Sequence, residues 1–257
     1  MSFKGLVLKV CAFLLVGLVA VASAALIAYK RPTASQQERL LPVDATQLPL
    51  ENGVLPVELR CEAVNSPAPN MVEPFSCLAI NNTRKRISAL AIQYSIVTEE
   101  AGVEDREDAL QTFDSAIHPD VSEARRLKLL PPGESRTLGP AGPTTFDRGI
   151  VKGIEVRIEY VEFEDKTSIG SVTQGAKMVK AMREGAARYK AWLVQQYKRK
   201  GMDAQAAASL LEDGELPKEL DFNGDANLAE GADLYRRIMR SVYTSQGAAE
   251  LKRYLNK

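Results

Sequence analysis

The chain has 257 residues, of which 45% are hydrophobic and 26% are charged, a composition typical of globular proteins and not of disordered ones. Lysine plus arginine number 33 and aspartate plus glutamate also number 33, a balance that argues against a general nucleic-acid binder. A single histidine and three cysteines without a Cys-x-x-Cys motif argue against a zinc site.

Residues 1–31 contain an uncharged, apolar run from residue 10 to residue 29. As a helix this run would be about 30 Å long, which matches the hydrocarbon core of a bilayer. Two interpretations stay open: an uncleaved signal anchor, and a signal peptide that is cleaved near Ala24. The apolar run continues past Ala24, which favours the anchor. We therefore expect the bulk of the chain outside the cytoplasm, periplasmic or at the cell surface, with secretion as the alternative after cleavage.

Residues 32–52 are predicted to form a linker, and residues 53–173 then change to a period of two, as in strands with one buried face. After Tyr160 the apolar residues Val161 and Phe163 continue out of phase, which predicts a β-bulge. Short strands separated by turns rich in Pro and Gly are typical of an antiparallel sandwich. Strands are predicted at residues 57–63, 75–80, 90–96, 127–129 and 154–163.

The segment 99–123 interrupts this pattern with nine acidic residues and one basic residue, so we expect a loop that is too polar for a central strand. It contains the only histidine, His118, in a His-Pro-Asp tripeptide of the kind found in J-domain cochaperones. A J-domain places the tripeptide after a basic helix, whereas acidic residues precede it here. No Gly-x-Ser-x-Gly motif accompanies a Ser-His-Asp triad either. We interpret His118 as a surface-loop residue.

Three features resemble bacterial extracytoplasmic immunoglobulin-like or fibronectin-III-like modules, including the FxLYD type. They are the strand end at residues 81–83, which reads Asn-Asn-Thr, the alternating run 90–96, and the turn at residues 130–134, which reads Leu-Pro-Pro-Gly-Glu. The resemblance covers residues 54–170. It implies an antiparallel sandwich with an adhesion, scaffolding or spacing role and no particular chemistry.

Cys61 and Cys77 fall on two neighbouring predicted strands. In an exported domain they can form a disulfide, because such compartments are oxidising. The alternative is two small, buried, reduced residues, since a disulfide needs Cα atoms less than about 7 Å apart and a sequence does not show this.

Residues 174–257 have a helical period. A helix over residues 176–200 is predicted to bury one stripe. A short helix capped by Asp203 is predicted to end near Leu211, and further helical segments follow at 228–242 and 251–255. The predicted stripe consists of Met178, Met182, Gly185, Tyr189, Trp192 and Gln196.

The same helix carries eight basic residues. They are predicted to contact an anionic lipid surface, to form a solvated face over the packed stripe, or to lie against the acidic segment 99–123. The solvated face is favoured, because small residues in the stripe suit close packing. The eight residues are Lys177, Lys180, Arg183, Arg188, Lys190, Lys198, Arg199 and Lys200.

The segment 221–225, Asp-Phe-Asn-Gly-Asp, begins like a calcium-binding loop. A calcium loop needs Gly at its sixth position and Glu at its twelfth, and this chain has Ala226 and Ala232 there. We interpret the segment as an Asx-turn that caps the next helix at Asp225, and we expect no metal ion and no cofactor.

These observations predict an α+β, mainly β protein: an N-terminal transmembrane or signal helix, an immunoglobulin-like sandwich and a helical C-terminal segment. The expected function is non-enzymatic binding or scaffolding, tethered to the membrane, with an unknown envelope protein or polymer as partner and no nucleic acid. The first alternative is a peripheral lipid-binding role of helix 177–200. The second is an envelope hydrolase with two carboxylates 5–9 Å apart. Its candidate carboxylates are Glu159, Glu162, Glu164 and Asp165.

Overall fold

The structure, a computed structural model, describes residues 39–46, 55–117, 129–139, 142–147, 149–212 and 214–256. The chain divides into the units Met1–Glu38 and Arg39–Lys257, and the described residues belong to the second. The leader expected at residues 1–31 and His118 lie outside the described residues. Among the described helices, none is both long enough and apolar enough to cross a membrane.

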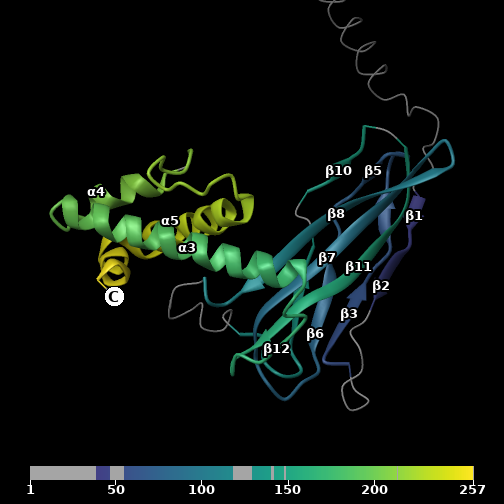
Figure 1. Cartoon of the computed structure of the whole chain (residues 1–257), viewed down its shortest axis with the longest axis horizontal. Helices are drawn as coiled ribbons and strands as arrows, with labels where there is room; N and C mark the ends of the chain where they lie inside the picture. Colours follow the sequence, from purple (N-terminus) through teal and green to yellow (C-terminus); the bar gives the residue numbers. More distant parts are fainter. Residues whose placement is uncertain are drawn as a thin grey trace, which may run out of the picture. The chain divides into compact units, whose positions relative to one another are not determined.

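The larger sheet is built on two 14-residue strands, β7 (Ile87–Glu100) and β11 (Ile150–Phe163), which pair antiparallel along their length (Figure 1). Strand β8 (Val103–Asp114) forms one edge beside β7. At the other edge, β12 (Ser168–Ile169) pairs antiparallel with β11, and β2 (Val43–Thr46) pairs parallel with it. The predicted bulge is confirmed by register shifts at both ends of the segment 160–162.

The smaller sheet contains β3 (Val57–Cys61), β6 (Cys77–Asn81) and β9 (Ser135–Leu138) in the order β3-β6-β9, all antiparallel. The predicted Leu-Pro-Pro-Gly-Glu turn leads directly into β9. Two short ribbons complete the strands: β1 (Arg39–Leu41) with β4 (Val64–Ser66), and β5 (Met71–Val72) with β10 (Thr144–Thr145).

The two sheets share one hydrophobic core. Because helices follow the strands along the chain, the fold is α+β with mostly β structure, as predicted. Strand β7 shows why its sequence alternates between large and small residues. Leu90 and Ile92 belong to the core between the sheets, whereas Ala89 and Ala91 belong to a second cluster with Val179 of a helix. Small side chains on that face allow the helix to lie close to the sheet.

Two expectations are wrong in part. The expected linker 32–52 contains β1 and β2, and β2 is paired because Val43 and Ala45 pack against the core. The parallel pairing of β2 also departs from a purely antiparallel sandwich. The expected acidic loop is strand β8 over residues 103–114. An edge strand tolerates this composition because its first six residues remain exposed to water.

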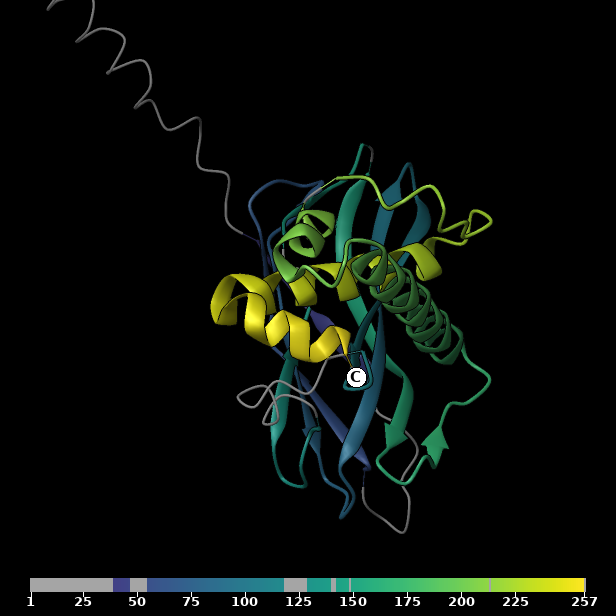
Figure 2. The same cartoon turned by 90° about the vertical axis from the view of Figure 1, so that its left-hand side faces the viewer.

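The C-terminal third consists of α3 (Gln174–Arg199), the short α4 (Ala204–Ala208) with the 3₁₀ turn η1 (Ser209–Leu211), and α5 (Ala226–Leu255) (Figures 1 and 2). The predicted helices and the capping role of Asp203 are confirmed. The segments predicted at 228–242 and 251–255 are parts of α5, which is interrupted at Gly247, where φ is 81°.

Helices α3 and α5 approach closely at two glycines. A Cβ atom on Gly185 would lie 1.9 Å from the carbonyl oxygen of Leu228, and one on Gly231 would lie 2.0 Å from that of Met182. Each glycine therefore faces the backbone of the other helix, and neither position has room for a side chain.

Candidate functional site

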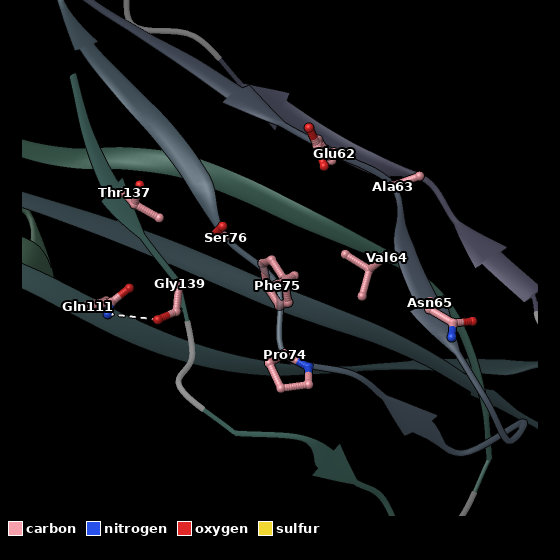
Figure 3. A pocket seen from close by; sticks show the side chains of 10 residues that line it. All are labelled: Glu62, Ala63, Val64, Asn65, Pro74, Phe75, Ser76, Gln111, Thr137 and Gly139. Carbon is pink, nitrogen blue, oxygen red and sulfur yellow. Dashed lines mark hydrogen bonds between the residues drawn. The ribbon is translucent and has the colours of Figure 1, made fainter. Parts of the chain in front are cut away.

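A pocket of about 440 Å³ lies where one end of the smaller sheet meets edge strand β8 (Figure 3). We call it the sheet-end pocket. Its residues come from the β3–β4 connection with the start of β4, the segment before β6, strand β8, and the end of β9 with the residue after it. They are Glu62, Ala63, Val64, Asn65, Pro74, Phe75, Ser76, Gln111, Thr137 and Gly139.

A disulfide joins Cys61 of β3 to Cys77 of β6 beside this pocket. The two residues are direct partners in the sheet register, and their Cα atoms are 4.2 Å apart. The next residue after Cys61 is Glu62, and the residue before Cys77 is Ser76, so both neighbours line the pocket. The disulfide therefore joins two segments of the pocket wall, and its two cysteines are 16 residues apart in the sequence.

Two side-chain amides of the pocket are held by their nitrogen atoms. Gln111 donates from Nε2 to the carbonyl oxygen of Gly139 at 2.9 Å, and Asn65 donates from Nδ2 to a carboxylate oxygen of Glu73 at 3.1 Å. Because these partners are acceptors, the nitrogen of each amide must face them. The amide oxygens, Oε1 and Oδ1, are buried and find no donor among the residues that the structure describes.

The remaining pocket wall combines one aromatic ring with one charge. The ring of Phe75 lies between the Gln111 and Asn65 ends of the pocket in Figure 3, and it contacts Tyr94 edge-on with ring centres 5.8 Å apart. Glu62 is the one ionisable side chain among the ten lining residues, and it is exposed. The sheet-end pocket thus offers two amide oxygens, two hydroxyls, a carboxylate and a ring face, and its ten lining residues include no cation.

A second polar cluster lies between helix α3 and the larger sheet. The guanidinium of Arg183 donates to both oxygens of Asp114, at 2.6 and 3.0 Å, and to both oxygens of Glu162, at 2.8 and 3.0 Å. Both carboxylates are buried. Ser88 and Tyr160 also donate to Glu162, each at 2.9 Å. Helix α3 is therefore joined to β8 and β11 through one arginine.

Burial alone would raise the pKa of Glu162, but hydrogen bonds from Arg183, Tyr160 and Ser88 outweigh burial and lower the pKa to about 2. Burial opposes the charge of Arg183 as well, and its two carboxylate partners nevertheless raise the pKa of its guanidinium. The cluster has two anions and one central cation, with Lys166 as a further donor to Glu162 at 3.3 Å. Its role is to orient α3, since every charged group in it has a partner.

We expect acid to weaken this fold. The ordinary pKa of a glutamate is 4.5 and that of Glu162 is about 2, so between these pH values the unfolded chain binds more protons than the folded one. The contribution of Glu162 to stability, up to about 3 kcal/mol, is present above pH 5 and is lost as the pH falls toward 2. Denaturant unfolding at pH 6, 4 and 3 measures this loss. A Glu162→Gln variant should lose less stability over the same range, and an equal loss would contradict the assignment.

The eight basic residues predicted on α3 do not form one surface. The guanidinium of Arg183 is bound to Asp114 and Glu162. Its contact with Asp114 corresponds to the predicted alternative in which the helix lies against segment 99–123. Arg188 pairs with Glu184 and donates to the carbonyl oxygen of Asp221. Six remain exposed: Lys177, Lys180, Lys190, Lys198, Arg199 and Lys200.

The aromatic residues of α3 do not accompany these cations to the surface. Tyr189 and Tyr197 are buried in the helical core, and Trp192 is partly buried against it. A peripheral membrane helix would place aromatic rings at the surface with its cations. The arrangement is that of a solvated face over a packed stripe.

The four carboxylates of the hydrolase hypothesis are each matched with a cation. Glu162 is buried and binds Arg183. Glu159 lies 2.8 Å from the guanidinium of Arg157. The remaining two pairs are Asp165 with Lys85 at 2.7 Å, and Glu164 with Arg86 at 4.0 Å.

The segment 221–225 has the Asx geometry predicted for it. Asp221 accepts from the backbone N–H of Asn223, and Asp225 accepts from those of Asn227 and Leu228 as the N-cap of α5. Within the described ranges no group of three or more His, Cys, Asp or Glu side chains could hold a metal ion.

The sequence did not point to Asn65, Phe75 or Gln111 as site residues. Gln111 carried one signal: it lies in an uncharged part of the acidic segment, where β8 passes from exposed to buried. No family model, curated protein or solved structure matches the chain. The geometry of the sheet-end pocket and of its disulfide therefore carries the functional interpretation.

Proposed function

We propose that this chain is a non-enzymatic binding or scaffolding protein of the cell envelope, tethered by its N-terminal helix with the remaining residues outside the cytoplasm. The observation that carries the proposal is the Cys61–Cys77 disulfide. Disulfides persist in oxidising compartments, and an apolar leader of bilayer length is what would deliver the chain to one.

Two packed sheets with a shared core also support the resemblance to immunoglobulin-like and fibronectin-III-like modules. Three features are additions to that pattern: the disulfide lies within one sheet, β2 is parallel to β11, and helix α3 covers one face of the larger sheet. Modules of this kind bind partners through the ends and connections of their strands. The sheet-end pocket is a concave site in such a position.

Thiol trapping in intact cells tests the compartment. A Cys11→Ser background leaves Cys61 and Cys77 as the thiols to be counted, and acid quenching followed by maleimide-PEG labelling counts those that are free. We expect no label without reductant and two labels after reduction. Two labels without reductant would contradict an oxidising compartment. Membrane fractionation with N-terminal sequencing then separates the tethered form from a form cleaved near Ala24.

The disulfide should also stabilise the fold measurably. A Cys61→Ser, Cys77→Ser double variant is expected to lower the free energy of unfolding by about 3 kcal/mol, the value for closing a loop of about 15 residues. Equilibrium denaturation compares the variant with the parent in the presence and absence of reductant. The parent should match the variant once reduced, and unchanged parent stability after complete reduction would contradict the prediction.

A further inference from the structure

The sheet-end pocket contains two hydrogen-bond acceptors for which the described residues supply no donor. The amide oxygens of Gln111 and Asn65 have no donor among the described residues, while their nitrogens are already engaged. A buried acceptor left without a donor costs about 1–3 kcal/mol. Both acceptors belong to residues that line one pocket, so a donor supplied by a ligand there could satisfy them.

The charged residues around the pocket also favour a ligand that donates hydrogen bonds. Glu62 lines it, and the carboxylate of Glu73 lies directly behind Asn65 as its hydrogen-bond partner. The ten lining residues include no lysine, arginine or histidine. An anionic ligand would find the hydroxyls of Ser76 and Thr137 as donors but no cation, and it would face the carboxylate of Glu62. A purely apolar ligand would leave both amide oxygens unpaired.

The ring of Phe75 adds a surface for a cation. It is only partly buried, and it lies between the two amides in Figure 3. An ammonium or guanidinium group over an aromatic face is attracted by the ring quadrupole. We infer that the sheet-end pocket, as the binding site of the function proposed above, takes a cationic hydrogen-bond donor, an ammonium or guanidinium group.

The terminal torsions of glutamine and asparagine side chains are broad, so each amide can turn toward a bound donor. The amide turns as one plane, so its nitrogen moves with its oxygen. The bond from that nitrogen to Gly139 or Glu73 is then weakened in exchange for a stronger bond from a charged donor to the oxygen. Figure 3 shows the Gln111 oxygen on the side of Ser76 and Thr137, away from its bond to Gly139.

Side-chain amide resonances of Gln111 and Asn65 give a direct readout. Full-length ¹⁵N-labelled protein in non-ionic detergent is titrated with acetyl-lysine methylamide, acetyl-arginine methylamide, spermidine and the neutral acetyl-norleucine methylamide. We expect saturable shifts of both side-chain amides with the cationic probes and none with the norleucine probe. Saturation by the amino-acid probes indicates a basic side chain of a partner as the source, and saturation by spermidine alone indicates a free polyamine.

Variants identify the contacts. Gln111→Leu should weaken binding of the cationic probe at least about tenfold, the effect of losing a hydrogen bond to a charged group. Phe75→Leu and Glu62→Gln should each weaken it about threefold. Glu134→Gln, an exposed carboxylate in the turn before β9, is the matched control and should bind as the parent does.

Equal shifts with norleucine, or no saturable shift with any cationic probe, would overturn the assigned ligand class. Weakening in Glu134→Gln as large as in Glu62→Gln would show general charge attraction and would overturn the assigned site. Variants are compared only where their thermal unfolding matches the parent, and Glu62→Gln, at an exposed position, keeps the test valid if Gln111→Leu does not fold. None of these outcomes bears on the proposed oxidising compartment, which thiol trapping tests separately.

Discussion

Replacing Arg183 with methionine is expected to lower the free energy of unfolding by about 3–5 kcal/mol, because two buried carboxylates lose their shared cation. Asp114 and Glu162 remain buried in the variant, and the energy lost is chiefly that of leaving their charges unpaired. Amide protons of α3 near Arg183 should also exchange faster, because this part of the helix opens more often from β8 and β11. Denaturant unfolding measures the loss, and amide hydrogen exchange along α3 locates it.

Two matched variants separate this effect from a general loss of charge. Arg188→Met removes an arginine of the same helix whose partner, Glu184, is exposed, and should cost about 0–1 kcal/mol. Adding Asp114→Asn and Glu162→Gln to Arg183→Met removes the stranded charges and should restore part of the stability. An Arg183→Met protein as stable as the Arg188→Met protein would show that the cluster does not hold α3.

Gly185→Ala is expected to destabilise the protein by about 3 kcal/mol, although alanine favours helix formation by about 1 kcal/mol over glycine. The added methyl group would meet the backbone carbonyl of Leu228, which cannot rotate away as a side chain could. For a protein of this size such a loss lowers the midpoint of thermal unfolding by roughly 6–12 °C. Gly231→Ala should behave alike, because it faces the backbone of Met182.

Gly142 provides the control for these two substitutions. A Cβ atom there has no neighbour within 4 Å, so Gly142→Ala should leave the thermal midpoint within about 2 °C of the parent value. If Gly185→Ala and Gly142→Ala had the same midpoint of thermal unfolding, the close approach of α3 and α5 at these glycines would be disproved.

Much of the fold could be predicted because local physics determines it. The alternation in β7 and β11 and the caps at Asp203 and Asp225 depend on nearest neighbours in the sequence, and all four are confirmed. The helical stripe was correct at Met182, Gly185 and Tyr189. It missed Leu193 and Tyr197, which are buried because α3 is covered on more than one side.

The failures have a common physical origin in distant partners. The sequence of β8 does not show that β7 will pair with it, so its acidic residues indicated a loop. Arg183 is one of eight bases in its helix, and only the positions of Asp114 and Glu162 distinguish it from the seven that it resembles. The sheet-end pocket is assembled from four separate segments and has no local sequence signature.

Strand β7 is covered by the smaller sheet on one face and by α3 on the other. A chain that stops before Gln174 would keep the strands and lose the cover of Ala89 and Ala91, together with the cation that neutralises Asp114 and Glu162. The boundary between strands and helices is therefore a change of secondary structure and not a place where the protein can be cut into two self-sufficient halves. During synthesis the strands leave the ribosome before the helices, so the folding of the sheets can be completed only after α3 has been made.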